Sequence, residues 1–303
     1  MRARPSTPLL FSVFMMTVFI WGTSWIVIKY SLDQGVTPLW GTTIRFFVAS
    51  IFMIVVSYKR IQKVKITKNL MKLMLVHGLF MIAVSNILVF WGQQFIASNL
   101  ASILFAIFPL MVAGFSHILL KNEKLNQGKL FGIFIGLIGV VIIFFDPAKM
   151  GDNNSILRGM LAIISSIFFI AIPTIIIKRD GRNQDPFVLN TGGMIIGFFA
   201  LLIIAIIGEG RQLPHYNSSA IIALTYLGIF ASSINFVAYF WLMKYIEVTK
   251  LSLSAYLTPI ITVIVASLLY NESVGLQDIL GMIIIFSGIF ISDYKSYLKV
   301  IKK

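Results

Sequence analysis

Two asparagines, Asn86 and Asn235, lie within long apolar runs, where an amide group is costly unless it is hydrogen-bonded. They are about 149 positions apart, and aromatic runs follow them, Phe90-Trp91 and Tyr239-Phe240-Trp241. Because an amide both donates and accepts hydrogen bonds, such a pair can orient a polar solute in a cavity at membrane depth. The alternative is that each amide bonds a neighbouring helix and only holds the helices together.

Two prolines, Pro109 and Pro259, occupy nearly matching places in the two halves of the chain. A proline inside a helix removes one backbone hydrogen bond and frees the carbonyl group one turn earlier. We expect each proline to form a hinge beside the cavity, whereas a static kink is the alternative. Hydroxyl-bearing residues within two turns of these prolines are expected to face the same space: Ser102, Ser252, Ser254, Tyr256 and Thr258.

A polar and aromatic patch near the N-terminus consists of Trp21, Thr23, Ser24 and Trp25. We expect these side chains to line the cavity. For the tryptophans, the alternative is a belt at the membrane surface. The counterpart in the second half, Ile170 to Thr174, is much less polar, so the site is expected to be asymmetric and richer in ligand contacts in the first half.

One arginine, Arg45, lies inside an apolar run. Its forked guanidinium matches a carboxylate, which makes Arg45 a candidate anion contact. The alternatives are that it reaches outward to the membrane surface or ties down a carbonyl group of a neighbouring helix. We find no Asp or Glu in the middle of any apolar run, which disfavours polyamine or quaternary-ammonium solutes. An aromatic cage, however, can also hold a cation.

Motifs of known catalytic sites are absent from the sequence. It contains no HExxH, GxSxG or P-loop motif and no cluster with metal-ligand spacing. The absence of cysteine excludes disulfides and thiolate metal sites. We therefore expect no enzymatic activity, no cofactor and no bound metal.

Ten apolar stretches must position these residues. The length of each stretch is close to the roughly 20 residues that a helix needs to cross a bilayer. The hydrophobic share is 58% and the charged share is 12%, against roughly 25% charged residues in soluble domains. We therefore predict an all-α integral membrane protein with ten transmembrane helices. The predicted spans are 9–29, 39–57, 70–92, 97–119, 129–145, 157–177, 187–207, 219–241, 248–269 and 277–293.

Lysine and arginine gather at the two termini and in the loops after every second predicted span. By the positive-inside rule, both termini face the cytoplasm. We expect a multi-pass protein of the bacterial inner membrane. The net charge of +14 is then a sign of topology, and nucleic-acid binding is disfavoured.

The two halves of the chain resemble each other beyond the asparagines and prolines, as in the match of Lys29 with Lys178. Each half holds five spans, and because five is odd, the second half enters the membrane in the opposite sense. We predict two inverted five-helix repeats, residues 1–147 and 148–303. Such repeats give two half-states around a shared site near the midplane, which is typical of alternating-access transport.

Several motifs in both halves carry a family resemblance. They are Trp21-Gly22-Thr23-Ser24-Trp25, Ile28-Lys29-Tyr30-Ser31-Leu32, Arg45-Phe46-Phe47-Val48-Ala49, the pairs Asn122-Glu123 and Asn271-Glu272, and the glycine-rich stretches 128–145 and 275–291. Together they resemble EamA-type proteins of the drug/metabolite transporter superfamily over residues 10–145 and 157–293. The resemblance implies a ten-helix, inverted-repeat transporter, often an exporter of amino acids or related metabolites.

These observations favour a secondary transporter for a small neutral or zwitterionic, amino-acid-like metabolite, with export as the expected direction. Its expected partners are the solute and membrane lipids, and the protein is expected to be a monomer or a homodimer. One alternative is an importer of amino acids, carboxylates or nucleotide derivatives. Another is a non-transporting membrane scaffold or a lipid translocator.

Overall fold

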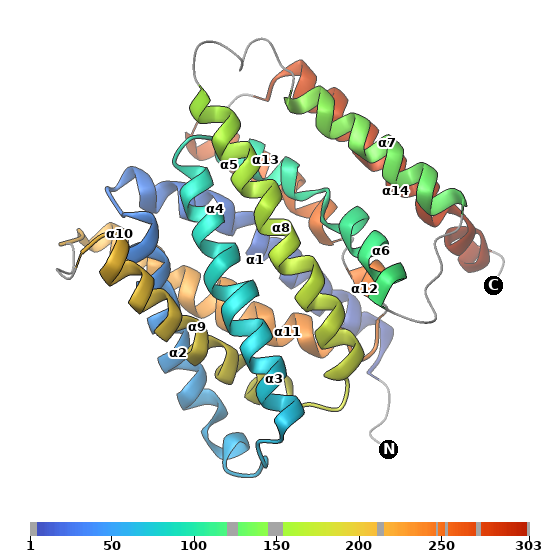
Figure 1. The fold of residues 1–303 in the computed structure, drawn as a ribbon. Helices are drawn as coiled ribbons and strands as arrows, with labels where there is room; N and C mark the ends of the chain where they lie inside the picture. The colour runs from blue at the N-terminus through green and yellow to red at the C-terminus, as the bar shows by residue number, and fades with distance from the viewer. Residues whose placement is uncertain are drawn as a thin grey trace.

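The computed structural model describes residues 5–119, 127–144, 154–210, 215–246, 248–251, 254–270 and 274–301. Within these ranges the chain is helical and contains no strand (Figure 1). The elements are α1 (Thr7–Asp33), α2 (Pro38–Ile61), α3 (Lys68–Val76), η1 (His77–Val84), α4 (Ser85–Gln93), α5 (Ser98–Phe105), α6 (Phe108–Leu119), α7 (Gln127–Phe144), α8 (Asn154–Asp180), α9 (Pro186–Gly208), α10 (Ser218–Tyr226), η2 (Leu227–Ile234), α11 (Asn235–Leu242), α12 (Val248–Leu251), α13 (Ser254–Tyr270) and α14 (Leu276–Ile301).

Among the described residues, 7 helical stretches are long and apolar enough to cross a membrane. Three of them join consecutive elements: Lys68–Gln93, Ser98–Leu119 and Ser218–Leu242. Shorter apolar helices lie at Phe134–Ile143, Ser254–Tyr270 and Leu276–Gly288. The predicted all-α membrane fold is confirmed, and each predicted span overlaps one of these apolar stretches. The pairs Asn122-Glu123 and Asn271-Glu272 lie outside the described residues.

Local residue chemistry sets the helix ends. The caps of α3 and α10 correspond, because the side chain of Thr67 accepts from the amide of Leu70, and that of Asn217 accepts from the amide of Ala220. The chain turns after α1 at Gly35, whose φ of 83° is one that glycine adopts without strain. These signals end the apolar helices at short turns, so consecutive spans run in opposite directions.

Two π-helical segments, η1 and η2, interrupt the third and eighth spans at matching places. Their first residues, His77 and Leu227, are 150 positions apart in the sequence. Nothing in the hydropathy pattern distinguishes a π segment from an α-helix, so the sequence does not predict these two segments. In the structure the repeat therefore has a register of 150 in this region, and Asn86 corresponds to Phe236 rather than to Asn235.

Helices of the two halves approach closely where glycines face each other. A Cβ atom added at Gly78 in η1 would lie 2.5 Å from the carbonyl oxygen of Gly193 in α9, and one added at Gly92 in α4 would lie 2.9 Å from that of Gly159 in α8. Helices α7 and α14 also lie side by side (Figure 1). Glycines thus allow close contact between helices of the two halves, which pack against each other along their length.

Two repeat-related lysines bind the carbonyl ends of repeat-related helices. The Nζ of Lys29, at the end of α1, donates to the carbonyl oxygen of Gln93 over 3.4 Å. The Nζ of Lys178, at the end of α8, donates to the carbonyl oxygens of Met243 and, over 2.7 Å, of Ile246. A cation at a helix C-terminus stabilises the unpaired carbonyl groups there. The two lysines therefore fasten opposite ends of the helical bundle.

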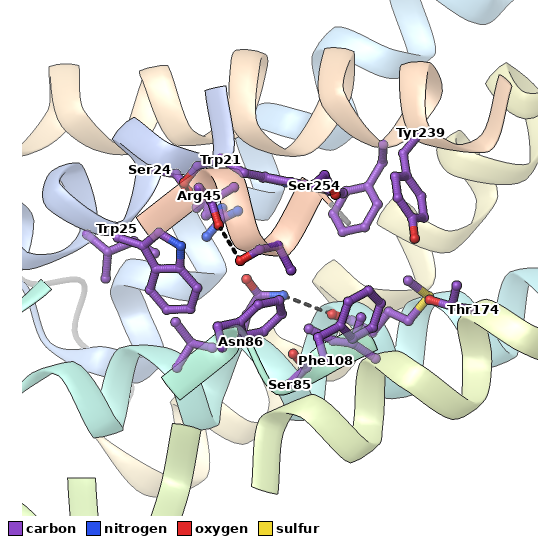
Figure 2. A pocket seen from close by; sticks show the side chains of 18 residues that line it. Trp21, Ser24, Trp25, Arg45, Ser85, Asn86, Phe108, Thr174, Tyr239 and Ser254 are labelled. Atoms are coloured by element: carbon purple, nitrogen blue, oxygen red, sulfur yellow. Dashed lines mark hydrogen bonds between the residues drawn. The ribbon is translucent and has the colours of Figure 1, made fainter. Parts of the chain in front are cut away.

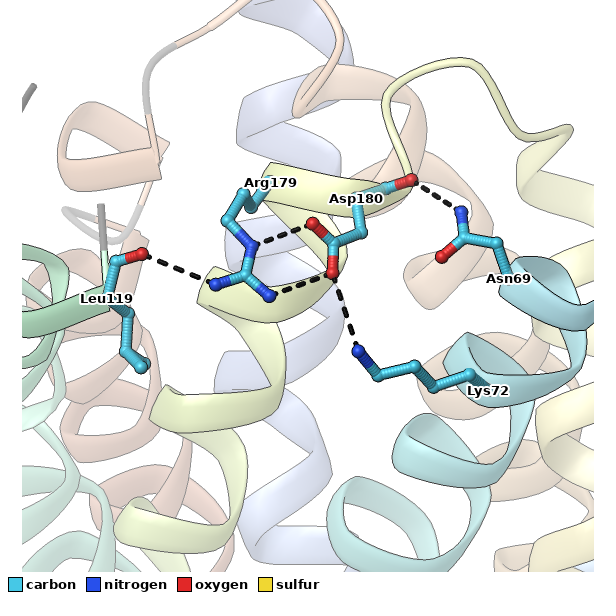
Figure 3. Close-up of polar contacts among 5 residues, drawn as sticks. All are labelled: Asn69, Lys72, Leu119, Arg179 and Asp180. Atoms are coloured by element: carbon cyan, nitrogen blue, oxygen red, sulfur yellow. Dashed lines mark hydrogen bonds and ion pairs between the residues drawn. The ribbon is translucent and has the colours of Figure 1, made fainter. Parts of the chain in front are cut away.

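A polar cluster next to Lys178 joins three spans at one end of the helical bundle (Figure 3). The guanidinium of Arg179 donates to both carboxylate oxygens of Asp180, over 2.7 and 2.9 Å, and to the carbonyl oxygen of Leu119 over 3.4 Å. The amide of Asn69 donates to the carbonyl oxygen of Asp180 over 3.0 Å, and Lys72 lies 3.8 Å from its carboxylate. The cluster thereby ties the end of α8 to α3 and α6.

At the other end of the bundle, Glu209 follows α9 and caps the N-terminus of α2. Its carboxylate accepts from the amides of Leu39 and Trp40, over 2.9 and 3.0 Å, and from the hydroxyl of Thr37 over 2.5 Å. We expect Glu209→Ala to lower the free energy of unfolding by about 1–2 kcal/mol, because it leaves these helix-end donors unpaired. Thermal unfolding in detergent measures the effect.

The matched control is Asp33→Ala, which removes an acidic residue at the end of α1. Asp33 makes a partly exposed ion pair with Lys29 at 3.4 Å, and exposed pairs contribute about 0–1 kcal/mol. Equal unfolding temperatures for the two variants would contradict a capping role for Glu209.

Candidate functional site

A cavity of about 100 Å³ lies between the two halves of the bundle (Figure 2). About 10–15 Å³ suffices for one water molecule on this measure, so the cavity is roomy enough for a small solute. Its lining comes from α1, α2, η1, α4, α5, α6, α8, α11 and α13. The 18 lining residues are Trp21, Ser24, Trp25, Ile28, Arg45, Met81, Ser85, Asn86, Val89, Phe105, Phe108, Ile170, Thr174, Phe236, Tyr239, Ser254, Ala255 and Thr258.

Much of this lining is duplicated with the register of 150 that the π segments set. The lining residues related in this way are Asn86 with Phe236, Val89 with Tyr239, Phe105 with Ala255 and Phe108 with Thr258. Helices α1 and α8, in which Lys29 corresponds to Lys178, add Trp25 with Thr174 at an offset of 149. The two members of each pair differ in size or polarity. The frame of the cavity is therefore repeated, whereas its chemistry is asymmetric.

The side chain of Asn86 presents only its carbonyl oxygen to the cavity. Its amide nitrogen donates to the carbonyl oxygens of Met81 and Ile82 over 2.9 and 3.0 Å. Both partners are acceptors, which fixes the orientation of the amide. The remaining Oδ1 atom can accept a hydrogen bond from a solute.

Two hydroxyl groups of the lining also act as acceptors toward the cavity. The hydroxyl of Ser24 donates to the carbonyl oxygen of Trp21 over 2.7 Å. That of Thr258 donates over 3.2 Å to the carbonyl oxygen of Ala255, the group that Pro259 frees from its helical bond. Because each hydroxyl has one hydrogen, the lone pairs that remain can accept from a solute.

Three further lining hydroxyls are buried and have no partner among the described residues: those of Ser85, Thr174 and Tyr239. An unpaired buried hydroxyl is costly. None of the three oxygen atoms has surface open to the cavity, so these hydroxyls lie within its wall, and Figure 2 shows them on the side of the cavity away from Trp25.

Aromatic rings form most of the apolar wall. The ring of Trp21 lies 5.1 Å from that of Tyr239 and 6.0 Å from that of Phe236. The ring of Trp25 lies 5.2 Å from that of Phe105, which stacks on Phe108 at 5.6 Å. Such walls suit an apolar or aromatic body, whereas the few polar groups orient one polar end.

A buried histidine supports this wall from behind without lining the cavity. The Nε2 atom of His77 lies 2.9 Å from the Oδ1 atom of Asn190, and the histidine ring meets the ring of Phe236 edge-on at 5.2 Å. The amide of Asn190 in turn donates to the carbonyl oxygen of Ser233 over 3.2 Å. This chain of contacts holds Phe236 in place from α9 and η2.

Seven of the residues singled out in the sequence line this cavity together: Trp21, Ser24, Trp25, Arg45, Asn86, Ser254 and Thr258. Arg45 is the only charged residue among the described lining. Its Nε atom donates to the hydroxyl of Ser232 over 2.9 Å, and its Cζ atom lies 5.0 Å from the ring centre of Phe46. Arg45 is buried, with 4% of its surface exposed.

The other candidate cavity residues lie elsewhere. The hydroxyl of Thr23 bonds that of Tyr226 at 2.8 Å, and the hydroxyl of Ser102 donates to the carbonyl oxygen of Asn99 over 2.8 Å. The amide of Asn235 donates to the carbonyl oxygen of Thr17 over 3.2 Å, so Asn235 joins two helices. Two residues remain: Tyr256 packs against Phe286 at 5.6 Å, and Ser252 lies outside the described residues.

The candidate hinge prolines flank cavity residues but differ in their helices. Pro109 begins α6 directly after a break from α5 and follows the lining residue Phe108. Pro259 lies inside α13 and follows Thr258. A third proline, Pro173, lies inside α8 beside Thr174. In α8 and α13 the carbonyl group freed by the proline is one turn earlier, close to the cavity wall, whereas Pro109 lies in the first turn of α6, where no helical hydrogen bond is lost.

Several lining residues were not singled out in the sequence, among them Phe236, Tyr239 and Thr174. The spacing between Pro109 and Pro259 indicates the offset that relates Phe236 and Tyr239 to lining residues of the first half. These prolines are 150 positions apart, and the same offset relates Asn86 to Phe236. No group of three or more potential metal-ligating side chains is present in the part of the chain that the structure describes.

Comparisons with known proteins agree with this architecture. The model of the EamA-like transporter family matches residues 9–145 and 157–292. The uncharacterized transporter YoaV of Bacillus subtilis is 26% identical over 91% of this chain and 93% of its own length. Protein PagO of Salmonella typhimurium is 24% identical over 92% and 91%. A crystal structure with a TM-score of 0.68 and 18% identity covers 95% of this chain and 97% of its own, and it supports the fold alone.

Proposed function

The chain belongs to the EamA-like transporter family and is a multi-pass membrane transporter, and on this premise we propose that its solute is a small neutral or zwitterionic, amino-acid-like metabolite. The observation that carries the proposal is the asymmetric cavity between the two halves. Its acceptors, such as Asn86 Oδ1, suit an ammonium group, and its aromatic wall suits an apolar side chain.

We propose that the solute crosses by alternating access, with one half rocking against the other around this cavity. The duplicated frame supports this mechanism, because the same contacts recur in helices of opposite direction. A membrane scaffold needs no cavity, whereas this protein has one, and the Oδ1 atom of Asn86 can accept a hydrogen bond from a solute held there. The cavity therefore favours transport over a scaffold role.

We further propose that the protein resides in the bacterial inner membrane with both termini in the cytoplasm, and that it exports its solute. The distribution of lysine and arginine supports the orientation. Labelling of single cysteines at each terminus tests it, and labelling of the two termini from different faces would refute it. Direction is tested in cells, where export gives resistance to a toxic solute and import gives accumulation.

Counterflow in liposomes tests the class of solute. Purified protein is reconstituted with a high internal concentration of each unlabelled amino acid, and uptake of the labelled form is followed. We expect saturable uptake of at least one amino-acid-like solute above that of protein-free liposomes. Clear movement of a solute of another class, with none of any amino-acid-like solute, would refute the proposal.

A further inference from the structure

The buried charge of Arg45 is incompletely paired. Arg45 lies in the second turn of α2 and lines the cavity. Its Nε atom donates to Ser232, whereas its two terminal nitrogens have no hydrogen bond and no ion pair within the described residues. A buried charge is costly unless it is paired and fully hydrogen-bonded. The cavity must therefore supply the missing acceptors, as water or as part of a solute.

The geometry around Arg45 leaves one edge of the guanidinium for a ligand. Ser232 in η2 occupies the Nε position, and the ring of Phe46 lies 5.0 Å from Cζ. The terminal nitrogens remain, and a pair of guanidinium N–H groups matches the two oxygens of a carboxylate. A neutral amide offers one oxygen and no charge, so it satisfies the same edge poorly.

The charge is not part of the duplicated frame. Helices α2 and α9 correspond at an offset of 148: a Cβ atom added at Gly228 would lie 2.7 Å from the carbonyl oxygen of Arg45, and one added at Gly78 would lie 2.5 Å from that of Gly193. The position of Arg45 therefore corresponds to Gly193 in α9, which does not line the cavity. Packing of the repeated frame thus does not require an arginine at this place. Because the charge is present on one side and not on the other, the cavity has a defined polar end.

We propose that Arg45 binds a carboxylate group of the transported solute and makes that carboxylate a requirement for transport. This inference rests on the proposed transport function and narrows its solute class to acids, including amino acids. Figure 2 shows Arg45 beside Trp21 and Ser24, across the cavity from Asn86 and Ser85. A carboxylate on Arg45 leaves an α-ammonium group for acceptors such as Asn86 Oδ1 and Ser24 Oγ, with the side chain against the aromatic wall.

Matched solutes that differ only at the carboxylate test this role. The probes are leucine with leucinamide and phenylalanine with phenylalaninamide, and 3-phenylpropanoate keeps the carboxylate without the amine. Binding is measured as thermal stabilisation in detergent, and transport as counterflow in liposomes. We expect the acids to bind at least about tenfold more tightly than their amides, because a site built for a polar group rejects analogues that lack it.

Three arginine variants separate the role of Arg45 from a general loss of fold or charge. Arg45→Gln should erase the preference for acid over amide, and Arg45→Lys should keep the preference with weaker binding, because it retains charge but loses the fork. Arg158→Gln, which removes an exposed arginine at the start of α8, should leave the preference unchanged.

The outcomes distinguish failure of the role of Arg45 from failure of the transport function. Equal binding of acids and amides by the unaltered protein overturns the role of Arg45 while leaving transport intact, and this result needs no variant to fold. Retention of the full preference by folded Arg45→Gln overturns it as well. Movement of no acid and no amide, together with movement of another solute class, refutes the proposed function itself.

Discussion

Replacing Ala255 with phenylalanine should abolish transport while leaving the protein folded. Ala255 lines the cavity of about 100 Å³, and a cavity of about 150 Å³ holds one benzene molecule. A phenyl ring added at this position would therefore fill the space that the solute needs. The corresponding residue in the other half is Phe105, so this part of the repeated frame already accommodates such a ring.

The measurement is counterflow in liposomes, with thermal unfolding in detergent to establish that the variant folds. The control is Leu268→Phe in the same helix, because Leu268 is 77% exposed and faces away from the protein interior. The Leu268→Phe variant should transport the solute at the rate of the unaltered protein. Normal transport by folded Ala255→Phe would show that the solute does not pass through this cavity.

Replacing Gly281 with leucine should strongly destabilise the protein by forcing α14 away from α7. A Cβ atom at Gly281 would lie 2.7 Å from the carbonyl oxygen of Gly139, and one at Gly139 would lie 2.6 Å from that of Gly281. Overpacking typically costs about 1–3 kcal/mol, and here the obstacle is backbone that cannot rotate away. We expect a loss of more than about 3 kcal/mol, measured as a lower unfolding temperature and a lower yield of folded protein.

Gly114→Leu is the matched control for this substitution. Gly114 lies in α6, and a Cβ atom added there has nothing within 4 Å. The Gly114→Leu variant should unfold at nearly the same temperature as the unaltered protein. Equal unfolding temperatures for the two leucine variants would mean that the contact between α7 and α14 does not depend on its glycines.

Hydropathy predicted the membrane spans well because the bilayer imposes a length and a composition on every crossing. For example, the predicted span 39–57 lies within α2, and 187–207 lies within α9. Hydropathy does not, however, indicate which side chains of a span face the cavity. Lipid is as apolar as the protein interior, so Phe236 in the cavity wall and Phe199 on the lipid side look alike in the sequence.

The polar residues of the site were easier to predict than their register. Asn86, Ser24 and Arg45 could be predicted because a polar group at membrane depth is costly unless it has a hydrogen-bond partner or a functional role. Asn235 stood out for the same reason, but the structure places it against the carbonyl oxygen of Thr17. A shift of one residue turns a helical position by about 100°, which is enough to exchange a cavity position for a contact between helices.

The π segment at His77–Val84 has a consequence for insertions and deletions in this chain. A π turn arises where one extra residue is accommodated in an α-helix. Loss of one residue there would return the segment to regular α-helix and leave Asn86 and Val89 on their present face. Loss of one residue from a regular span such as α8 would instead rotate everything beyond it by about 100°. We therefore expect a deletion of one residue to be tolerated in the π segment of the third span and not in a regular span such as α8.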